Sequence, residues 1–144
     1  MGFGADLRAV CERAKGRIDE VVRATAVGLY DGMQNRAPVD TGRLRANFVV
    51  GLGSQNASTT LDTNAEAARA KAQGALAAWK RGESIYITNS LPYAVVAEYG
   101  LYGKPPGSAN GPKTVNGFPK QAVGGFVRLT VQDFQKTLRK AASA

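Results

Sequence analysis

The chain has 144 residues, of which 44% are hydrophobic, so it can bury one core and is too short for two comfortable domains. Its only cysteine, Cys11, cannot form an internal disulfide, and the lack of histidine excludes most transition-metal sites. No apolar run approaches the roughly 18 residues that a membrane span requires, so we expect a soluble protein without membrane contact, a single α+β domain over residues 1–144.

The charge of the chain is unevenly distributed. There are 19 Lys and Arg residues against 11 Asp and Glu, a formal net charge of +8. Residues 101–144 hold seven basic and one acidic side chain, whereas the rest of the chain is close to balanced. This excess favours an acidic protein surface or another polyanion as the partner, contacted by the last third of the chain.

The first expected element is one amphipathic helix over about residues 5–37. Apolar residues recur at three- and four-residue steps from Leu7 onward, and Pro38 ends the pattern. At ~1.5 Å per residue this helix would be ~50 Å long, whereas a compact chain of this length is only ~35 to 40 Å across. The helix must therefore either break near Gly28 or Gly32, or project and pack against a neighbouring subunit.

The middle of the chain predicts a small antiparallel sheet between helices. The expected elements are strands at 48–52 and 85–88 and helices at 65–80 and 93–99. Thr63 is followed three residues later by Glu66, which is a capping-box pattern for the start of the first of these helices.

The last third predicts a long loop and one helix. Residues 100–120 contain five glycines and four prolines, a density that predicts a Gly/Pro-rich loop without regular structure. Such loops are usually functional or disordered, so we expect this one to be mobile in the free subunit. From Gln121 onward, apolar residues at helical spacing predict one C-terminal amphipathic helix.

Enzyme chemistry finds little support in this sequence. Without histidine, a serine or cysteine nucleophile would need a lysine or an N-terminal amine as its base, and no Ser-x-x-Lys pattern occurs. Asp40-Thr41-Gly42 is also the tripeptide of aspartic proteases, but that chemistry needs two such aspartates. Glu83 and Glu98 stand alone, which favours surface or capping roles. We therefore expect no enzyme, no cofactor and no metal.

We interpret Pro38, Asp40, Thr41 and Gly42 as a structural turn. An oxygen of Asp40 or Thr41 should accept backbone N–H groups beyond the proline, and Gly42 is expected to have a positive φ. The basic residues and aromatic side chains of the last third are the candidate partner contacts. These are Tyr102, Lys104, Lys113, Phe118, Lys120 and Lys136.

Two segments carry a family resemblance. Residues 38–45 read Pro-Val-Asp-Thr-Gly-Arg-Leu-Arg, and residues 89–100 read Asn-Ser-Leu-Pro-Tyr-Ala-x-x-x-Glu-Tyr-Gly. With a long helix before them and a strand between them, they resemble the tail-component family of long-tailed bacteriophages, the tail-completion or neck proteins that join tail to head.

The resemblance implies a structural virion protein, assembled in the bacterial host cytoplasm, that forms a ring of six or twelve copies at the head-tail junction. It implies contacts with other neck or tail proteins, such as the tail terminator, head-closure or connector proteins, and contact without sequence specificity to DNA passing the lumen. The competing interpretation is a small basic nucleic-acid-binding protein, since Tyr102 and Phe118 interleave with the lysines of the loop.

Overall fold

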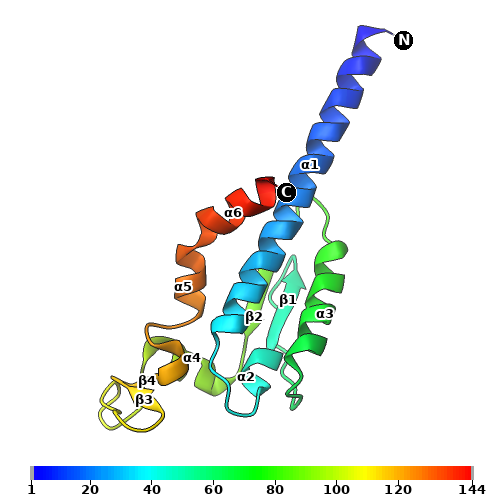
Figure 1. The fold of residues 1–144 in the computed structure, drawn as a ribbon. Helices are drawn as coiled ribbons and strands as arrows, with labels where there is room; N and C mark the ends of the chain where they lie inside the picture. The colour runs from blue at the N-terminus through cyan, green and yellow to red at the C-terminus, as the bar shows by residue number, and fades with distance from the viewer. Residues whose placement is uncertain (1, 144) are drawn as a thin grey trace.

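The fold was obtained as a computed structural model, which describes residues 2–143 (Figure 1). It is a mixed α+β fold, as the sequence predicts, with a long N-terminal helix, two-stranded antiparallel sheets and C-terminal helices. In chain order the elements are α1 (Phe3–Arg36), α2 (Arg43–Ala46), β1 (Phe48–Leu52), α3 (Ala65–Ala77), β2 (Ile85–Asn89), α4 (Pro92–Tyr99), β3 (Thr114–Val115), β4 (Phe118–Pro119), the 3₁₀ helix η1 (Lys120–Ala122), α5 (Val127–Gln132) and α6 (Phe134–Ser143).

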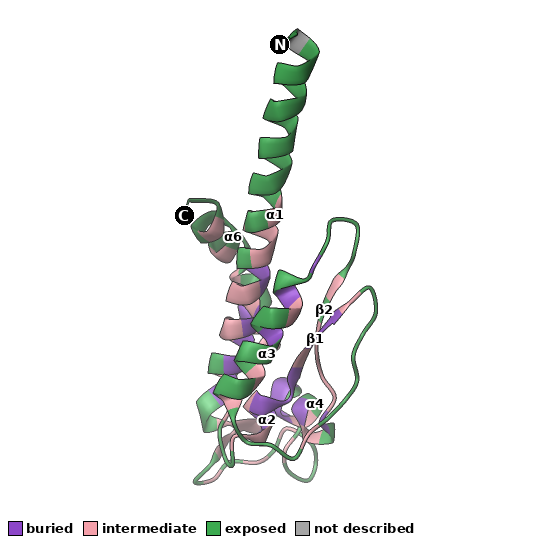
Figure 2. Ribbon diagram, turned by 90° about the vertical axis from the view of Figure 1, so that its right-hand side faces the viewer, coloured by how far each residue is buried: buried purple, intermediate pink, exposed green. Residues whose placement is uncertain are grey.

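Helix α1 is unbroken, and its first half projects beyond the rest of the molecule (Figures 1 and 2). Every residue from 4 to 18 is exposed, and we call this segment the arm. Its 15 residues rise ~22 Å along the helix axis. The length of the helix left two alternatives, a break near Gly28 or Gly32 and a projecting helix. The structure shows the projecting helix.

Gly28 and Gly32 of α1 serve close packing rather than a break. A Cβ atom at Gly28 would lie 2.6 Å from Cγ2 of Thr137, and one at Gly32 would lie 2.8 Å from Cγ2 of Thr130. Both positions therefore lack a side chain where α5 and α6 cross α1. Each glycine lowers the intrinsic stability of the helix by ~1 kcal/mol relative to alanine. In return, the absence of a side chain allows α5 and α6 to pack closely against α1.

The core lies between α1, α3 and the sheet of β1 and β2. The two strands pair antiparallel from Phe48 opposite Asn89 to Leu52 opposite Ile85, and α1 and α3 cover one face of this sheet (Figures 1 and 2). Tyr30 and Phe126 each meet the ring of Phe48 edge to face, at centroid distances of 6.3 and 6.1 Å. The Tyr30 hydroxyl donates to the Phe48 carbonyl at 2.9 Å, so the buried phenol is paired.

Two of the expected element boundaries are wrong. The side chain that caps α3 is Asn64, whose Oδ1 accepts from the Ala67 N–H at 3.0 Å, and not Thr63 of the capping-box pattern. The expected single C-terminal helix is divided into η1, α5 and α6. Gly124 and Gly125, with φ of +90° and +100°, interrupt the helix between η1 and α5, because a right-handed helix needs a negative φ at every residue. Glycine adopts such positive values more readily than any residue with a side chain.

The Gly/Pro-rich segment is also more ordered than the sequence predicts. It contains the β3–β4 hairpin, in which Val115 pairs with Phe118. The Tyr102 N–H donates to the Gly117 carbonyl at 3.1 Å, and the N–H of Ala109 donates to the Tyr102 carbonyl at 3.1 Å. The ring of Phe118 lies so close to Gly100 that a Cβ atom there would be 2.5 Å from it. The expectation that this segment has no regular structure is therefore wrong.

Candidate partner-binding cleft

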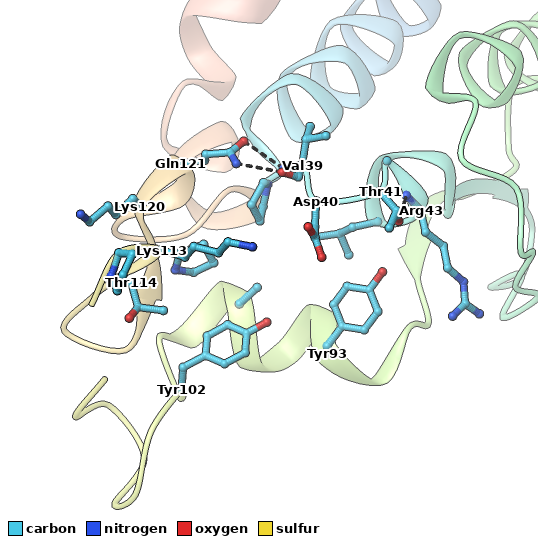
Figure 3. Close-up of a pocket in the computed structure, with 16 residues that line it drawn as sticks. Val39, Asp40, Thr41, Arg43, Tyr93, Tyr102, Lys113, Thr114, Lys120 and Gln121 are labelled. Atoms are coloured by element: carbon cyan, nitrogen blue, oxygen red, sulfur yellow. Dashed lines mark hydrogen bonds between the residues drawn. The ribbon is translucent and has the colours of Figure 1, made fainter. Parts of the chain in front are cut away.

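The two sequence segments that carry the family resemblance meet across a cleft of about 820 Å³ (Figure 3). One wall is the turn between α1 and α2, the floor is α4, and the other wall is the segment that holds the β3–β4 hairpin. The lining residues are Pro38, Val39, Asp40, Thr41, Gly42, Arg43, Leu44, Tyr93, Ala97, Tyr102, Pro112, Lys113, Thr114, Pro119, Lys120 and Gln121.

Gln121 ties the two walls together. The Val39 N–H donates to Gln121 Oε1 at 3.0 Å, and Gln121 Nε2 donates to the Val39 carbonyl at 2.8 Å, as the dashed lines in Figure 3 mark. These reciprocal bonds resemble a pair of ladder bonds between strands. They join residues 82 positions apart and set the width of the cleft at one end.

The turn has the geometry that its residue types favour. Gly42 has φ +94°, and a Cβ atom there would lie 2.6 Å from the Thr63 carbonyl oxygen, so both backbone conformation and space require glycine. Thr41 Oγ1 accepts from the Arg43 N–H at 3.3 Å. The Asp40 carboxylate has no hydrogen-bonding or ion-pair partner within residues 2–143, and Figure 3 shows it directed into the cleft near Tyr93.

Cations outnumber anions in the cleft. Lys113 and Lys120 come from the hairpin side and Arg43 from the turn side, with Asp40 as the lining carboxylate. Arg43 is partly engaged, because its Nε donates to the Thr60 carbonyl at 3.0 Å. Burial raises the pKa of the Tyr93 hydroxyl, an effect that the nearby Arg43 opposes. Tyr93 therefore stays protonated near neutral pH and can donate a hydrogen bond.

The sequence-predicted residues are only partly brought together. Tyr102, Lys113 and Lys120 line the cleft, together with the four residues of the predicted turn. Three others lie outside it: Lys104 is exposed beside Pro105, Phe118 packs on Gly100, and Lys136 is exposed on α6.

Sequence reasoning missed several residues of the cleft, among them Arg43, Tyr93 and Gln121. Arg43 and Tyr93 stand in the two resemblance segments, and this position was a usable signal. Gln121 had none, because its partner Val39 is distant in sequence.

Glu98 of the second segment has a different place, at the N-terminus of α5. Its side chain is 8% exposed, and its two oxygens accept from the backbone N–H groups of Phe126, Val127 and Arg128 at 2.8 to 2.9 Å. Arg128 Nε adds a bond of 3.0 Å. Burial raises the pKa of this carboxyl, but the hydrogen bonds outweigh it, so the pKa lies below its ordinary value. Glu98 is therefore a cap, one of the roles expected for it.

Within residues 2–143, no three His, Cys, Asp or Glu side chains gather as a metal ion would need. In the same part of the chain, every helix is too short or too polar to cross a membrane.

Comparison with known proteins assigns a family. The model of the family described as "Bacteriophage HK97-gp10, putative tail-component" matches residues 2–100, which include α1, the turn and α4. A search of the curated proteins and of the solved structures found no match. Because the family match covers well over half of the chain and both resemblance segments, this protein belongs to the HK97-gp10-like family of bacteriophage tail components.

Proposed function

We propose that this protein is a structural virion protein that forms a ring at the head-tail junction of a tailed bacteriophage, completing the tail or joining it to the capsid connector. Membership of a tail-component family supports a structural role in the virion. In this proposal the ring contains six or twelve copies and contacts other neck or tail proteins. The protein has no catalytic step and no cofactor.

The exposed apolar side chains of the arm are the observation that supports self-association. Leu7, Val10 and Ile18 are 51%, 52% and 59% exposed, and with Ala14 they form one apolar stripe at helical spacing. An isolated helix of this length is marginal in water. Packing of the stripe against a neighbouring subunit would remove apolar surface from water and stabilise the arm.

The stripe continues a face that α6 covers nearer the body. Thr137 of α6 packs against Gly28, and the Arg17 guanidinium donates to the Ala142 carbonyl near the end of α6. Beyond that end, the same side of α1 has no cover within residues 2–143. A surface of the next subunit would extend the cover. Because the stripe would then meet a different surface of its neighbour, the contact is heterologous, and such contacts give closed rings when the rotation closes.

Charge substitutions on two faces of the arm test the proposal. Val10→Glu places a carboxylate in the stripe, and Ala9→Glu places the same charge on the opposite side of the same turn. We expect the wild type and Ala9→Glu to sediment as a closed oligomer, alone or on purified tail tubes, and Val10→Glu to remain monomeric with unchanged circular dichroism. Phage lacking the native gene should be rescued by Ala9→Glu and not by Val10→Glu.

Two results would remove the proposal. One is a wild-type protein that stays monomeric at high concentration and is absent from purified virions. The other is equal behaviour of the two variants, because a stripe that packs against a neighbour must tolerate charge less than the exposed opposite face.

A further inference from the structure

We propose that the cleft docks an extended acidic peptide segment of a neighbouring neck or tail protein. This inference deepens the proposed function by naming the chemistry of one partner. It rests on the shape, charge and rigidity of the cleft, and not on the arm.

The shape of the cleft suits a single extended chain. Its volume of about 820 Å³ lies in the range of ~300 to 1,000 Å³ typical of sites that enclose a ligand. The cleft runs between the turn and the hairpin segment, and α4 forms its floor (Figure 3). A DNA duplex presents a convex surface with its phosphates outside, and such a surface would meet the rims of this cleft and not its floor.

The charges are spaced along the cleft. Figure 3 shows Lys113 directed into it, whereas Lys120 and Arg43 stand at opposite ends with their side chains directed outward. Carboxylates carried at intervals along a peptide could each meet one of these cations. The unpartnered carboxylate of Asp40 can accept from peptide backbone N–H groups, so the site offers partners to both the side chains and the backbone of a strand.

The floor adds groups that favour peptide over a bare polyanion. The rings of Tyr93 and Tyr102 lie at the base of the cleft, with hydroxyls directed toward the turn (Figure 3). Tyrosine supplies a large apolar contact and a hydrogen bond at small entropic cost, which is why it is enriched in protein interfaces.

The cleft is held open before any ligand arrives. The backbone N–H of Lys120 donates to the Lys113 carbonyl at 2.9 Å, which joins the residues that flank the β3–β4 hairpin on either side. The reciprocal bonds between Gln121 and Val39 fix the hairpin to the turn. Little backbone ordering remains to oppose binding, so a short segment can bind with useful affinity.

The test uses the full chain and a defined probe, a ten-residue polyglutamate peptide with an N-terminal fluorescein. Like charges keep this peptide extended. We expect saturable binding in fluorescence anisotropy at low salt, weakened as salt rises. Lys113→Glu should weaken binding about tenfold or more, because it removes a charged contact and adds repulsion.

The chain offers matched controls in the same basic third. Lys104→Glu and Lys136→Glu make the same change of net charge at exposed sites outside the cleft, and each should alter binding less than about twofold. Lys113→Gln removes the cation without adding a carboxylate and should weaken binding by a smaller factor. Circular dichroism of each variant confirms the fold.

Three outcomes would overturn the inference: no saturable binding, equal weakening by the Lys104, Lys113 and Lys136 substitutions, or stronger Lys113-dependent binding of a 20-base-pair DNA duplex than of the peptide. The last would assign the cleft to nucleic acid. None of these measurements requires oligomers or virions, so a failure here leaves the ring untouched. Failure of the arm test likewise leaves the cleft untouched.

Discussion

Replacing Glu98 by glutamine should test how α4 and α5 are joined. In the native protein the Glu98 carboxylate accepts three backbone N–H groups at the start of α5 and one bond from Arg128. Glutamine keeps the shape but has one carbonyl oxygen and one NH₂ group. The NH₂ group must then face backbone N–H donors that previously met an oxygen, and Arg128 loses its ion pair.

The magnitude follows from these contacts. Hydrogen bonds to charged groups contribute ~1.5 to 3 kcal/mol each and neutral ones ~0.5 to 1.5 kcal/mol, and a buried donor left unpaired adds a penalty of ~1 to 3 kcal/mol. Relaxation around the exposed Arg128 recovers part of this. We expect Glu98→Gln to lower the free energy of unfolding by ~2 to 4 kcal/mol in urea denaturation followed by circular dichroism. Glu12→Gln, on the exposed arm, should change it by less than ~0.5 kcal/mol.

The pH dependence gives an independent measurement. The pKa of Glu98 is lower in the folded protein than its ordinary value of 4.5, so the folded state releases this proton more readily than the unfolded state. The stabilisation is therefore complete above about pH 4.5 and is lost as the pH falls through the folded pKa. Glu98→Gln should reduce the acid-dependent loss of stability. A variant as stable as Glu12→Gln, with an unchanged pH profile, would refute the capping role.

The remaining predictions concern the turn and the glycines of α1, all measured as free energies of unfolding in urea. Thr41→Ala should cost ~0.5 to 1.5 kcal/mol because its hydroxyl accepts a backbone N–H, whereas Asp40→Ala should change stability by less than ~0.5 kcal/mol; a larger cost at Asp40 would contradict the observed geometry. Gly42→Ala should cost ~2 to 3 kcal/mol from its positive φ and the nearby Thr63 carbonyl, and a neutral result would mean that the turn relaxes freely. Gly32→Ala should destabilise by ~1 to 2 kcal/mol because it displaces Thr130, while Gly16→Ala, with no atom within 4 Å, should be neutral or stabilising by up to ~1 kcal/mol. Equal effects at the two glycines would exclude the close packing of α5 on α1.

Sequence reasoning succeeded where a local signal determines the structure. The start and end of α1 follow from apolar periodicity and from Pro38, and β1 follows from its β-branched run. The positive φ of Gly42 follows from turn chemistry that involves only neighbouring residues. Such features depend on sterics and side-chain spacing within a few residues, so they can be predicted without knowing the rest of the fold.

Two errors of sequence reasoning share one physical cause. The glycines of α1 suggested a break, but Gly32 is needed by Thr130, which lies about a hundred residues later. Gly125 ends the expected C-terminal helix because it must approach Glu98, to which a Cβ atom would come within 2.7 Å. In each case the partner that explains the residue is distant in sequence, so no local pattern contains the information.

The features of the candidate cleft also divide into those that the sequence predicts and those that depend on the fold. The amino-acid sequence alone determined that a turn follows α1, that a short helix carries Tyr93, and that the last third is basic. Only the tertiary structure decided that Lys113 and Lys120 line the cleft beside that turn while Lys104 and Lys136 do not. The reason is that the position of the hairpin depends on long-range bonds, among them the two between Gln121 and Val39. These bonds form only when both sides of the cleft are packed in place.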